Sequence, residues 1–209
     1  MMDNVILDCT KKNKTYEPYR FFVKENPKAI LLLELKSHSE EDLQRQTETL
    51  LESLKISAYS YHSPILRGEE IDMALELRKA GLGLLGNMVG DKKAVACIED
   101  TAVALEDLSA YIKEFSALMK KYDQQAVYYA HAGAGELHLR PILNLKEAEG
   151  VAYFRKITTD VAKLCKKYNG SFSGEHGDGI VRAEFIPLMI GEKNYELLKR
   201  IKSAFDPKN

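Results

Sequence analysis

The sequence predicts an α+β fold, in which an antiparallel or mixed sheet of the ferredoxin-like type carries packed helices. Two observations lead to this prediction. Strand-like and helical segments follow in the order β-α-β, then α, then β-α-β-β-α-β, which is too rich in helices for a β-sandwich. Two of the strands are separated by only a short glycine-rich loop, and such a hairpin excludes an all-parallel sheet. The order leaves open whether half of the fold is duplicated.

Length and composition are those of one globular domain. The chain has 209 residues, of which 45% are hydrophobic and 29% charged, and no apolar run approaches the roughly 20 residues needed to cross a bilayer. A formal net charge of −1 gives no basic surface for nucleic acid. Cys9, Cys97 and Cys165 lie far apart without CxxC spacing, and the N-terminus has no apolar signal region. We therefore expect a cytoplasmic protein without a disulfide framework.

The chain begins with a lead-in arm. Residues 1–28 have no clear period and predict a short helix followed by irregular structure, so the predicted domain comprises residues 29–209. Its first element is Ala29–Leu35, an almost continuous apolar run that is typical of a strand covered on both faces.

A helix, a strand and a second helix are predicted next. Ser39 offers an N-cap with Asp42 three residues later, and leucines at helical spacing follow. The alternation in Ser57–His62 indicates a short strand. Glu69–Ala80 has a helical pattern, and Gly81 is expected to end this helix.

The segment Gly81–Gly86 spells GxGxxG, the pattern of a dinucleotide-binding turn. That turn must follow a strand and open a helix so that the pyrophosphate meets the helix N-terminus. Here the pattern follows a helix and leads into the loop at residues 88–92. We therefore reject dinucleotide binding and expect a flexible apolar loop.

The second half contains longer helices. Ala94–Ile98 is the predicted strand, and Glu99–Thr101 should end it as an acidic turn. An apolar stripe from Leu105 to Met119 predicts a long helix laid on a sheet. The elements predicted after the hairpin are a helix at Leu145–Asn169, a brief strand at Ser171–Ser173 and a final helix at Tyr195–Phe205.

The hairpin between the long helices carries two histidines. If Gly133–Glu136 form its loop, His131 lies directly opposite His138. Directly opposed residues project from one face with Cβ atoms about 4.5–5.5 Å apart, so both imidazoles can reach one metal ion. The same pair is also consistent with two unrelated polar positions, and spacing alone leaves both interpretations open.

A second glycine-rich segment, Ser173–Gly179, supplies the remaining groups of a metal site. Glu175 would complete a His₂Glu set with His131 and His138, and such a set leaves one position open on a catalytic zinc ion. His176 would remain available to move protons, because imidazole titrates near neutral pH.

Two motifs, His131-Ala-Gly-Ala-Gly-Glu-Leu-His138-Leu-Arg140-Pro141 and Ser173-Gly-Glu175-His176-Gly-Asp-Gly, resemble the C-terminal substrate domain of the FAD-linked oxidases. This family includes glycolate oxidase, D-lactate dehydrogenase and D-2-hydroxyglutarate dehydrogenase. The resemblance runs from about residue 28 to the end. It is strongest to bacterial fusion proteins that also carry an iron–sulfur domain, in which segments similar to residues 93–103, 140–146 and 205–207 occur.

The resemblance implies roles for individual residues. In the family, the positions that match His131, His138 and Glu175 hold zinc or a similar divalent ion, which binds the carboxylate and hydroxyl of a D-2-hydroxy acid. The position that matches His176 is the base.

Three arginines are candidates for substrate binding. Arg140 follows His138 by two and should share its face, so it could hold a second carboxylate. Arg78 matches a substrate-binding arginine of the family more loosely, and Arg182 follows the second motif. A plain salt bridge is the alternative for each.

The implied function is that of a cap domain in a flavin-dependent D-2-hydroxy-acid dehydrogenase, inactive alone. The dehydrogenase would oxidise a small molecule such as 2-hydroxyglutarate or lactate to the 2-oxo acid, with the hydride passing to FAD held by a separate domain. A membrane-peripheral placement of the longer protein is left open. The alternatives are a free-standing zinc hydrolase that uses the same site and a non-catalytic ligand-binding module.

Two positions depart from the family pattern. Glu136 stands where many relatives have Asn, and Asp178 replaces an apolar residue. Glu136 could either add a ligand or point to solvent.

Overall fold

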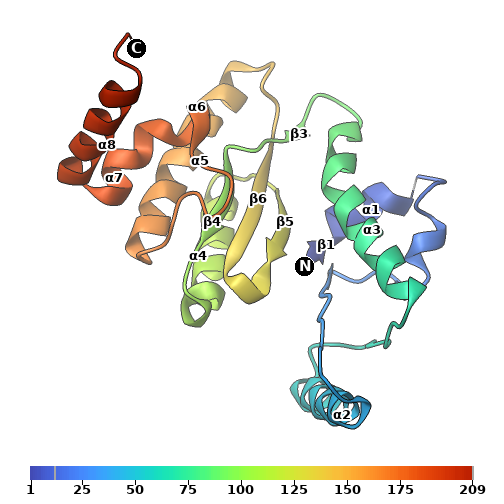
Figure 1. Cartoon of the computed structure of the whole chain (residues 1–209). Helices are drawn as coiled ribbons and strands as arrows, with labels where there is room; N and C mark the ends of the chain where they lie inside the picture. Colours follow the sequence, from blue (N-terminus) through green and yellow to red (C-terminus); the bar gives the residue numbers. More distant parts are fainter. Residues whose placement is uncertain (12, 209) are drawn as a thin grey trace. The chain divides into compact units, whose positions relative to one another are not determined.

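The computed structural model describes residues 1–11 and 13–208 and forms two compact units. Met2–Gly83 make the N-terminal unit, and the chain from Leu84 onward, together with Met1, makes the C-terminal unit. Figure 1 colours the first from blue to green and the second from green to red. No helix in the described part combines the length and apolarity needed to pass through a bilayer.

The N-terminal unit is mainly helical. Its elements are β1 (Met2–Asp3), α1 (Asn4–Lys11), a 3₁₀ turn (Pro18–Arg20), β2 (Ala29–Ile30), α2 (Glu40–Ser57) and α3 (Glu69–Leu84). Ser39 caps α2 as expected, because its side chain accepts a hydrogen bond from the Asp42 amide. A small core around Phe22 and Leu77 holds the unit together.

Two strand predictions for this unit are wrong. The apolar run at residues 29–35 pairs only through β2. Beyond Ile30 no strand of the described residues pairs with it, and Leu31 and Leu33 are exposed. Ser57–His62 is not a strand, since α2 continues to Ser57 and an irregular segment follows.

The predicted stop at Gly81 is also wrong, because α3 passes through it to Leu84. A Cβ at Gly81 would lie 2.5 Å from Cγ2 of Ile6. The glycine therefore allows α1 and α3 to approach closely and does not terminate the helix. Residues 81–87 are α-helical and then 3₁₀-helical, so the apolar loop expected there is absent, and the rejection of a dinucleotide turn agrees with this geometry.

The C-terminal unit contains the sheet that carries the histidines. Its elements are β3 (Lys93–Ala94), β4 (Ile98–Ala102), α4 (Leu108–Lys121), β5 (Ala126–His131), β6 (Glu136–Leu143), α5 (Ala148–Lys167), α6 (Gly179–Arg182), α7 (Ile186–Ile190) and α8 (Glu192–Phe205). Further 3₁₀ turns lie at Leu85–Asn87, Leu105–Asp107, Ala132–Ala134 and Ala183–Phe185. The short helices α6 and α7 were not predicted.

The strand order confirms an α+β fold with an antiparallel sheet. β6 pairs antiparallel with β5 on one side and with β4 on the other, and β4 pairs with Ser171 through one antiparallel bridge. With α4 and α5 as connections, this is the βαββαβ order of a ferredoxin-like unit. The predicted strand at residues 171–173 is thus reduced to a single bridge.

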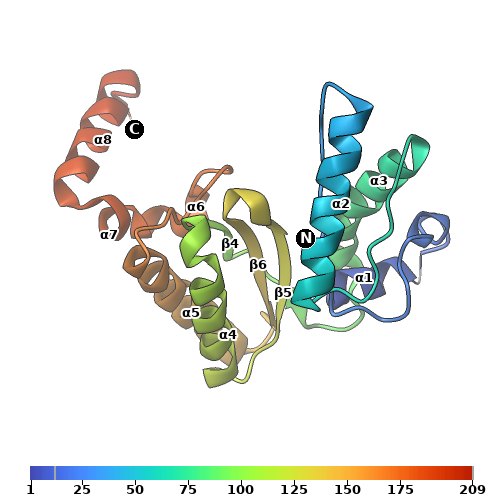
Figure 2. The same cartoon turned by 90° about the horizontal axis from the view of Figure 1, so that it is seen from below.

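One face of this sheet is covered by α4 and α5 (Figures 1 and 2). Leu137 and Leu139 of β6 point into the core on this face, together with Phe115 of α4 and Ile157 of α5. Alternation along the strand sends Glu136, His138 and Arg140 to the opposite face.

The strand predicted at residues 94–98 is displaced along the chain. Glu99–Thr101 do not end a strand but form the middle of β4, where the ladder with β6 is irregular between Glu99 and Thr101. Asp100 has a φ of +81° at this bulge and is fully buried. A buried acidic bulge has the composition of an exposed turn, which explains the error.

The hairpin has a different register from the predicted one. His131 faces Glu136 and His138 faces Tyr129, because the connection is the 3₁₀ turn Ala132–Ala134 followed by Gly135. The two histidines are therefore diagonal neighbours on one face, and their ring centroids lie 5.6 Å apart. The expectation of a shared face holds, whereas the direct pairing is wrong.

Replacing Gly135 by alanine is expected to destabilise the protein by about 1–3 kcal/mol. Gly135 has a φ of +71°, and an added Cβ would lie 2.1 Å from the Val103 carbonyl oxygen. This distance is a steric clash, so the backbone of Gly135 or Val103 would have to shift. Urea unfolding measures the effect. Gly133→Ala in the same turn is the control, because its Cβ would meet open space. Equal unfolding free energies for the two variants would contradict this account.

Candidate metal centre

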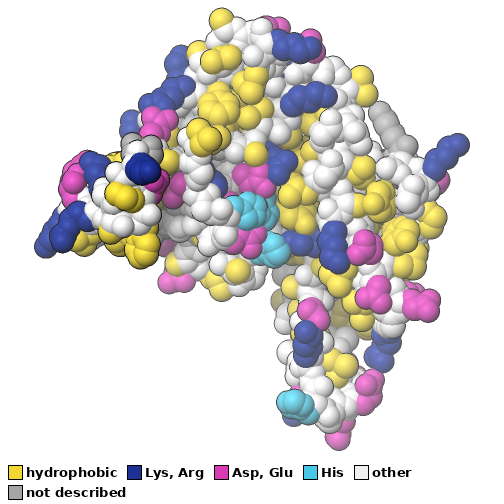
Figure 3. Space-filling view, turned by 45° about the horizontal axis from the view of Figure 1, so that its top comes forward, with side chains coloured by type: hydrophobic (Ala, Val, Ile, Leu, Met, Phe, Trp, Pro, Cys, Tyr) yellow, Lys and Arg dark blue, Asp and Glu magenta, His cyan; other side chains and the backbone are white. Residues whose placement is uncertain are grey.

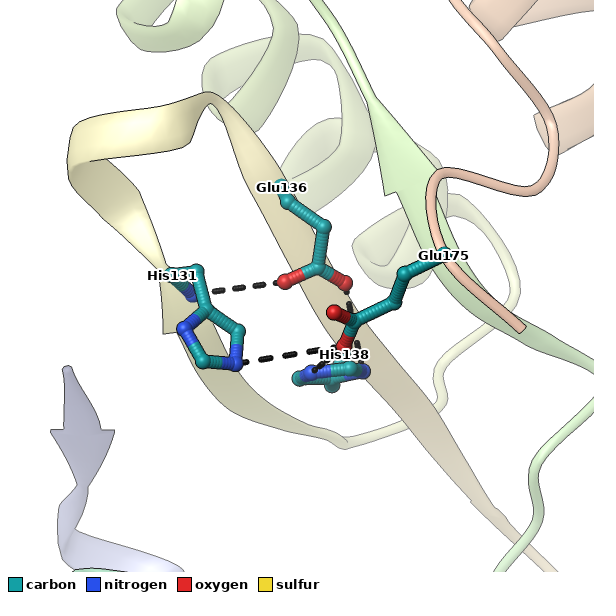
Figure 4. Close-up of side chains that lie close together, drawn as sticks. All are labelled: His131, Glu136, His138 and Glu175. Atoms are coloured by element: carbon teal, nitrogen blue, oxygen red, sulfur yellow. Dashed lines mark hydrogen bonds and ion pairs between the residues drawn. The ribbon is translucent and has the colours of Figure 1, made fainter.

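The predicted ligands meet at one carboxylate oxygen. Oε1 of Glu175 lies 3.5 Å from Nε2 of His138, 3.9 Å from Nε2 of His131 and 3.3 Å from Nε2 of His176. Figure 4 shows Glu175 reaching from its loop to the two histidines of the hairpin, and Figure 3 shows histidine and acidic side chains gathered together at the surface. The structure thus brings together residues from β5, β6 and the loop after Ser171.

The loop that carries Glu175 is fixed by Asp100. Its Oδ1 accepts a hydrogen bond from the Glu175 amide at 2.9 Å, and its Oδ2 accepts one from the His176 amide at 2.8 Å and one from the Ser173 hydroxyl at 2.6 Å. The Asp100 carbonyl also accepts from the Gly174 amide at 2.6 Å. The buried bulge of β4 therefore positions the backbone of the whole second motif.

The charge state of Asp100 follows from these contacts. Burial raises its pKa, but the hydrogen bonds from Ser173, His176 and Glu175 outweigh burial and hold the pKa below the ordinary value. Asp100 is therefore an ionised anchor at neutral pH. Sequence reasoning assigned it only to the end of a strand, because no sequence signal shows that a carboxylate receives amides from a distant loop.

His138 occupies the centre of the site. It is 3% exposed, and its ring stacks on His176 with centroids 5.3 Å apart and lies 5.4 Å from the Tyr129 ring. Burial lowers the pKa of His138, and the opposing influence of Glu99 does not cancel this effect. A neutral imidazole is the form that binds metal ions.

The Nδ1 side of His138 faces two carboxylates. Oε1 of Glu136 is 3.2 Å away and Oε1 of Glu99 is 3.6 Å away. Arg140 neutralises Glu99, with its Nη2 at 2.8 Å from Oε1 and 2.6 Å from Oε2. Metal-binding histidines commonly present their second nitrogen to a carboxylate, which orients the ring.

Glu136 does not point to solvent. Its residue is 6% exposed, and Oε2 accepts a long hydrogen bond of 3.4 Å from the His131 amide. Burial raises the pKa of Glu136 to about 7, helped by the nearby charges of Glu175 and Asp100 and opposed by the His131 amide. The sequence left open whether Glu136 adds a ligand or points to solvent, and the second interpretation is therefore wrong.

The donor set fits a divalent ion. Two ligands on a tetrahedral ion with bonds of about 2.0–2.2 Å lie about 3.3–3.6 Å apart, close to the separation between Glu175 and His138. One ligand atom each from His131, Glu136, His138 and Glu175 lies within 4.8 Å of the others. His176 joins smaller groups with Glu99 and His138 and with Asp100 and Glu175, but among the described residues it shares no such group with His131.

The three predicted substrate arginines have different positions. Arg140 lies on the same face of β6 as His138, as expected, and is paired with Glu99. Arg182 is buried on α6, where it donates hydrogen bonds to the carbonyls of Gly177 at 2.7 Å and of Phe172 at 3.4 Å. This placement favours support of the loop over contact with a substrate. Arg78 is half-buried on α3, which belongs to the N-terminal unit.

An α+β domain that gathers two imidazoles and two carboxylates beside a third histidine has the donor groups of a candidate metal centre. Comparison with known proteins identifies the family: the profile of "FAD linked oxidases, C-terminal domain" matches residues 1–209. The chain belongs to this family, as its motifs indicated.

Individual relatives agree with this assignment. The chain is 38% identical to a D-2-hydroxyglutarate dehydrogenase of Pseudomonas putida over 68% of its own length and 14% of the relative's. It is 32% identical to a D-2-hydroxyglutarate dehydrogenase of Haemophilus influenzae over 100% of its length and 21% of the relative's. It is 25% identical to glycolate oxidase subunit GlcD of Bacillus subtilis over 87% of its length and 38% of the relative's. The chain thus spans well under half the length of these curated relatives.

Proposed function

We propose that this chain is the substrate- and metal-binding domain of a flavin-dependent dehydrogenase that oxidises a D-2-hydroxy acid, such as 2-hydroxyglutarate or lactate, to the 2-oxo acid. The observation that carries the proposal is the convergence of His131, His138 and Glu175 within reach of one ion, with His176 beside them. The relatives named D-2-hydroxyglutarate dehydrogenase support the choice of substrate class.

Different residues of the chain would bind the metal ion and accept the substrate proton. When bound, zinc or a similar ion lowers the pKa of the substrate hydroxyl, and FAD accepts the hydride from Cα. His131, His138 and Glu175 would hold the ion. His176 receives the hydroxyl proton at Nε2, and its backbone is fixed for this task by Asp100.

Two of the three arginines would select the substrate. Arg140 stands on the same face as the metal ligands and could hold a second carboxylate, which favours 2-hydroxyglutarate over lactate; in the structure its guanidinium is paired with Glu99. Arg78 is proposed as a further substrate ligand. Arg182, the third candidate, contributes by holding the loop.

The proposal requires partners. FAD would be held by a separate FAD-binding domain, and an iron–sulfur domain would pass the electrons on. Residues 29–209 are proposed as the substrate domain with 1–28 as its arm, although the family match also includes the arm. We place the enzyme in the cytoplasm, consistent with the buried unpaired thiols of Cys97 and Cys165.

Flavin reduction tests this function. With the FAD-binding domain present, anaerobic addition of D-2-hydroxyglutarate is expected to bleach the flavin absorbance, whereas the L enantiomer leaves it unchanged. His176→Gln should keep the metal but slow bleaching by about 10²–10⁴-fold, because the base is lost. Hydrolysis of an ester by the chain without flavin would instead support the zinc hydrolase. Absence of both reactions would leave a ligand-binding module.

A further inference from the structure

The carboxylate of Glu136 has an unsatisfied atom inside the site. Its Oε1 is buried and, among the described residues, has no hydrogen-bond partner. The neighbouring Nδ1 of His138, at 3.2 Å, is not aligned for a hydrogen bond and is itself unsatisfied. A buried carboxylate oxygen without a partner is costly, so a missing partner is expected at this place.

The surroundings of Glu136 indicate what that partner is. Figure 4 shows its carboxylate directed into the space bordered by His131, His138 and Glu175. The Glu136 residue is more than nine-tenths buried, and its ligand atom lies within 4.8 Å of one from each of these residues. No described Lys or Arg forms an ion pair with it, whereas Glu99 on the other side of the His138 ring is neutralised by Arg140. A cation is therefore the partner that the position lacks.

We propose that Glu136 is a fourth protein ligand, so that this chain has a His₂Glu₂ centre. The inference rests on the proposed function and deepens it. Two carboxylates neutralise the charge of a divalent ion, whereas the His₂Glu set leaves one positive charge. The second carboxylate would also contribute a hard oxygen donor to the ion.

The fourth ligand limits the choice of ion. A tetrahedral ion would then have its four positions filled by protein, and a hydroxy acid would have to add as a fifth and sixth ligand. Ions that readily accept six ligands with mixed nitrogen and oxygen donors, such as Mn²⁺, Fe²⁺ or Co²⁺, meet this requirement better than Zn²⁺.

Cobalt binding tests the fourth ligand. The metal-free chain is titrated with Co²⁺, and both the affinity and the visible absorption spectrum are recorded, since the spectrum reports the number and kind of ligands. Glu136→Gln keeps the shape of the side chain and removes its charge. We expect Co²⁺ affinity to fall by about 100-fold or more, with an altered spectrum. Glu106→Gln, the same change at an exposed position, should match the wild type.

The outcomes separate three possibilities. If Glu136 only accepts a hydrogen bond from His138, the amide oxygen of glutamine can still accept it. The Glu136→Gln chain would then show an unchanged spectrum and a Co²⁺ affinity within about threefold of the wild type. That result would overturn the fourth ligand but leave the His₂Glu site and the proposed function standing. A folded wild-type chain that binds no Co²⁺ would overturn both. Glu136→Asn is the second variant if Glu136→Gln does not fold, and the same spectral change is expected from it.

Discussion

Replacing His138 by alanine is expected to lower the affinity of the chain for divalent metal by more than about 100-fold. Loss of a residue that merely orients a ligand costs about 10–100-fold, so loss of a ligand itself should exceed that range. His138 is also the most buried of the candidate ligands, and its removal leaves Glu136 and Glu175 to repel each other without an imidazole between them.

Metal content after dialysis and calorimetric titration with Zn²⁺ or Mn²⁺ measure this effect. His62→Ala, the same change at an exposed histidine of the N-terminal unit, is the matched control and should bind metal as the wild type does. Because His138 is buried, its loss also creates a cavity, so His131→Ala serves as a second variant at a half-exposed ligand. Retention of the wild-type metal content by both histidine variants, and by a variant lacking His131, His138 and Glu175 together, would reject the site.

Replacing Asp100 by asparagine is expected to destabilise the chain by about 2–4 kcal/mol and to weaken metal binding by about 10–100-fold. The carboxylate accepts hydrogen bonds from Ser173, Glu175 and His176, and an amide group must turn a donor toward at least one of these donors. Asparagine tolerates a positive φ, so the variant tests the hydrogen bonds and leaves the backbone conformation at the bulge unstrained.

The contribution of Asp100 to the free energy of unfolding should depend on pH. Its folded-state pKa lies below the unfolded value, so its stabilisation is fully present above the unfolded pKa of about 3.9 and is lost as pH falls through the folded pKa. Urea unfolding from neutral to acidic pH should therefore show the wild type losing this part of its stability in acid, whereas Asp100→Asn lacks it throughout. Asp123→Asn is the control, because Asp123 also has a positive φ but is exposed. Equal free energies of unfolding for Asp100→Asn and Asp123→Asn would show that the Asp100 carboxylate does not hold the loop that carries Glu175.

The long helices and the presence of a hairpin, though not its register, were predictable because their signals are local. Apolar residues at helical spacing located α4 and α5, and Ser39 marked the start of α2. The two motifs also identified the family and the side chains that the structure gathers in one cluster. These signals lie within a few residues of chain, so they need no knowledge of packing.

The strand boundaries failed where long-range contacts decided them. The apolar run at Ala29–Leu35 forms only a two-residue strand because, in the described part of the chain, no strand pairs with the rest. Gly81 lies within α3, where the missing side chain leaves room for Ile6. The hairpin turn comprises Ala132–Ala134 and Gly135, and not the predicted Gly133–Glu136. His131 therefore lies opposite Glu136, and the predicted His131–His138 pair is a diagonal one.

The sequence by itself determined the fold class, the family and the set of side chains from which a metal centre can be built, because residue types and their order carry that chemistry. Only the tertiary structure decided which of these side chains are buried and which groups they contact. It buried Glu136 in the site, paired Arg140 with Glu99, and made Asp100 the anchor of a loop more than 70 positions away. Burial and pairing arise from residues distant along the chain, and their free energies depend on surroundings that no local pattern records.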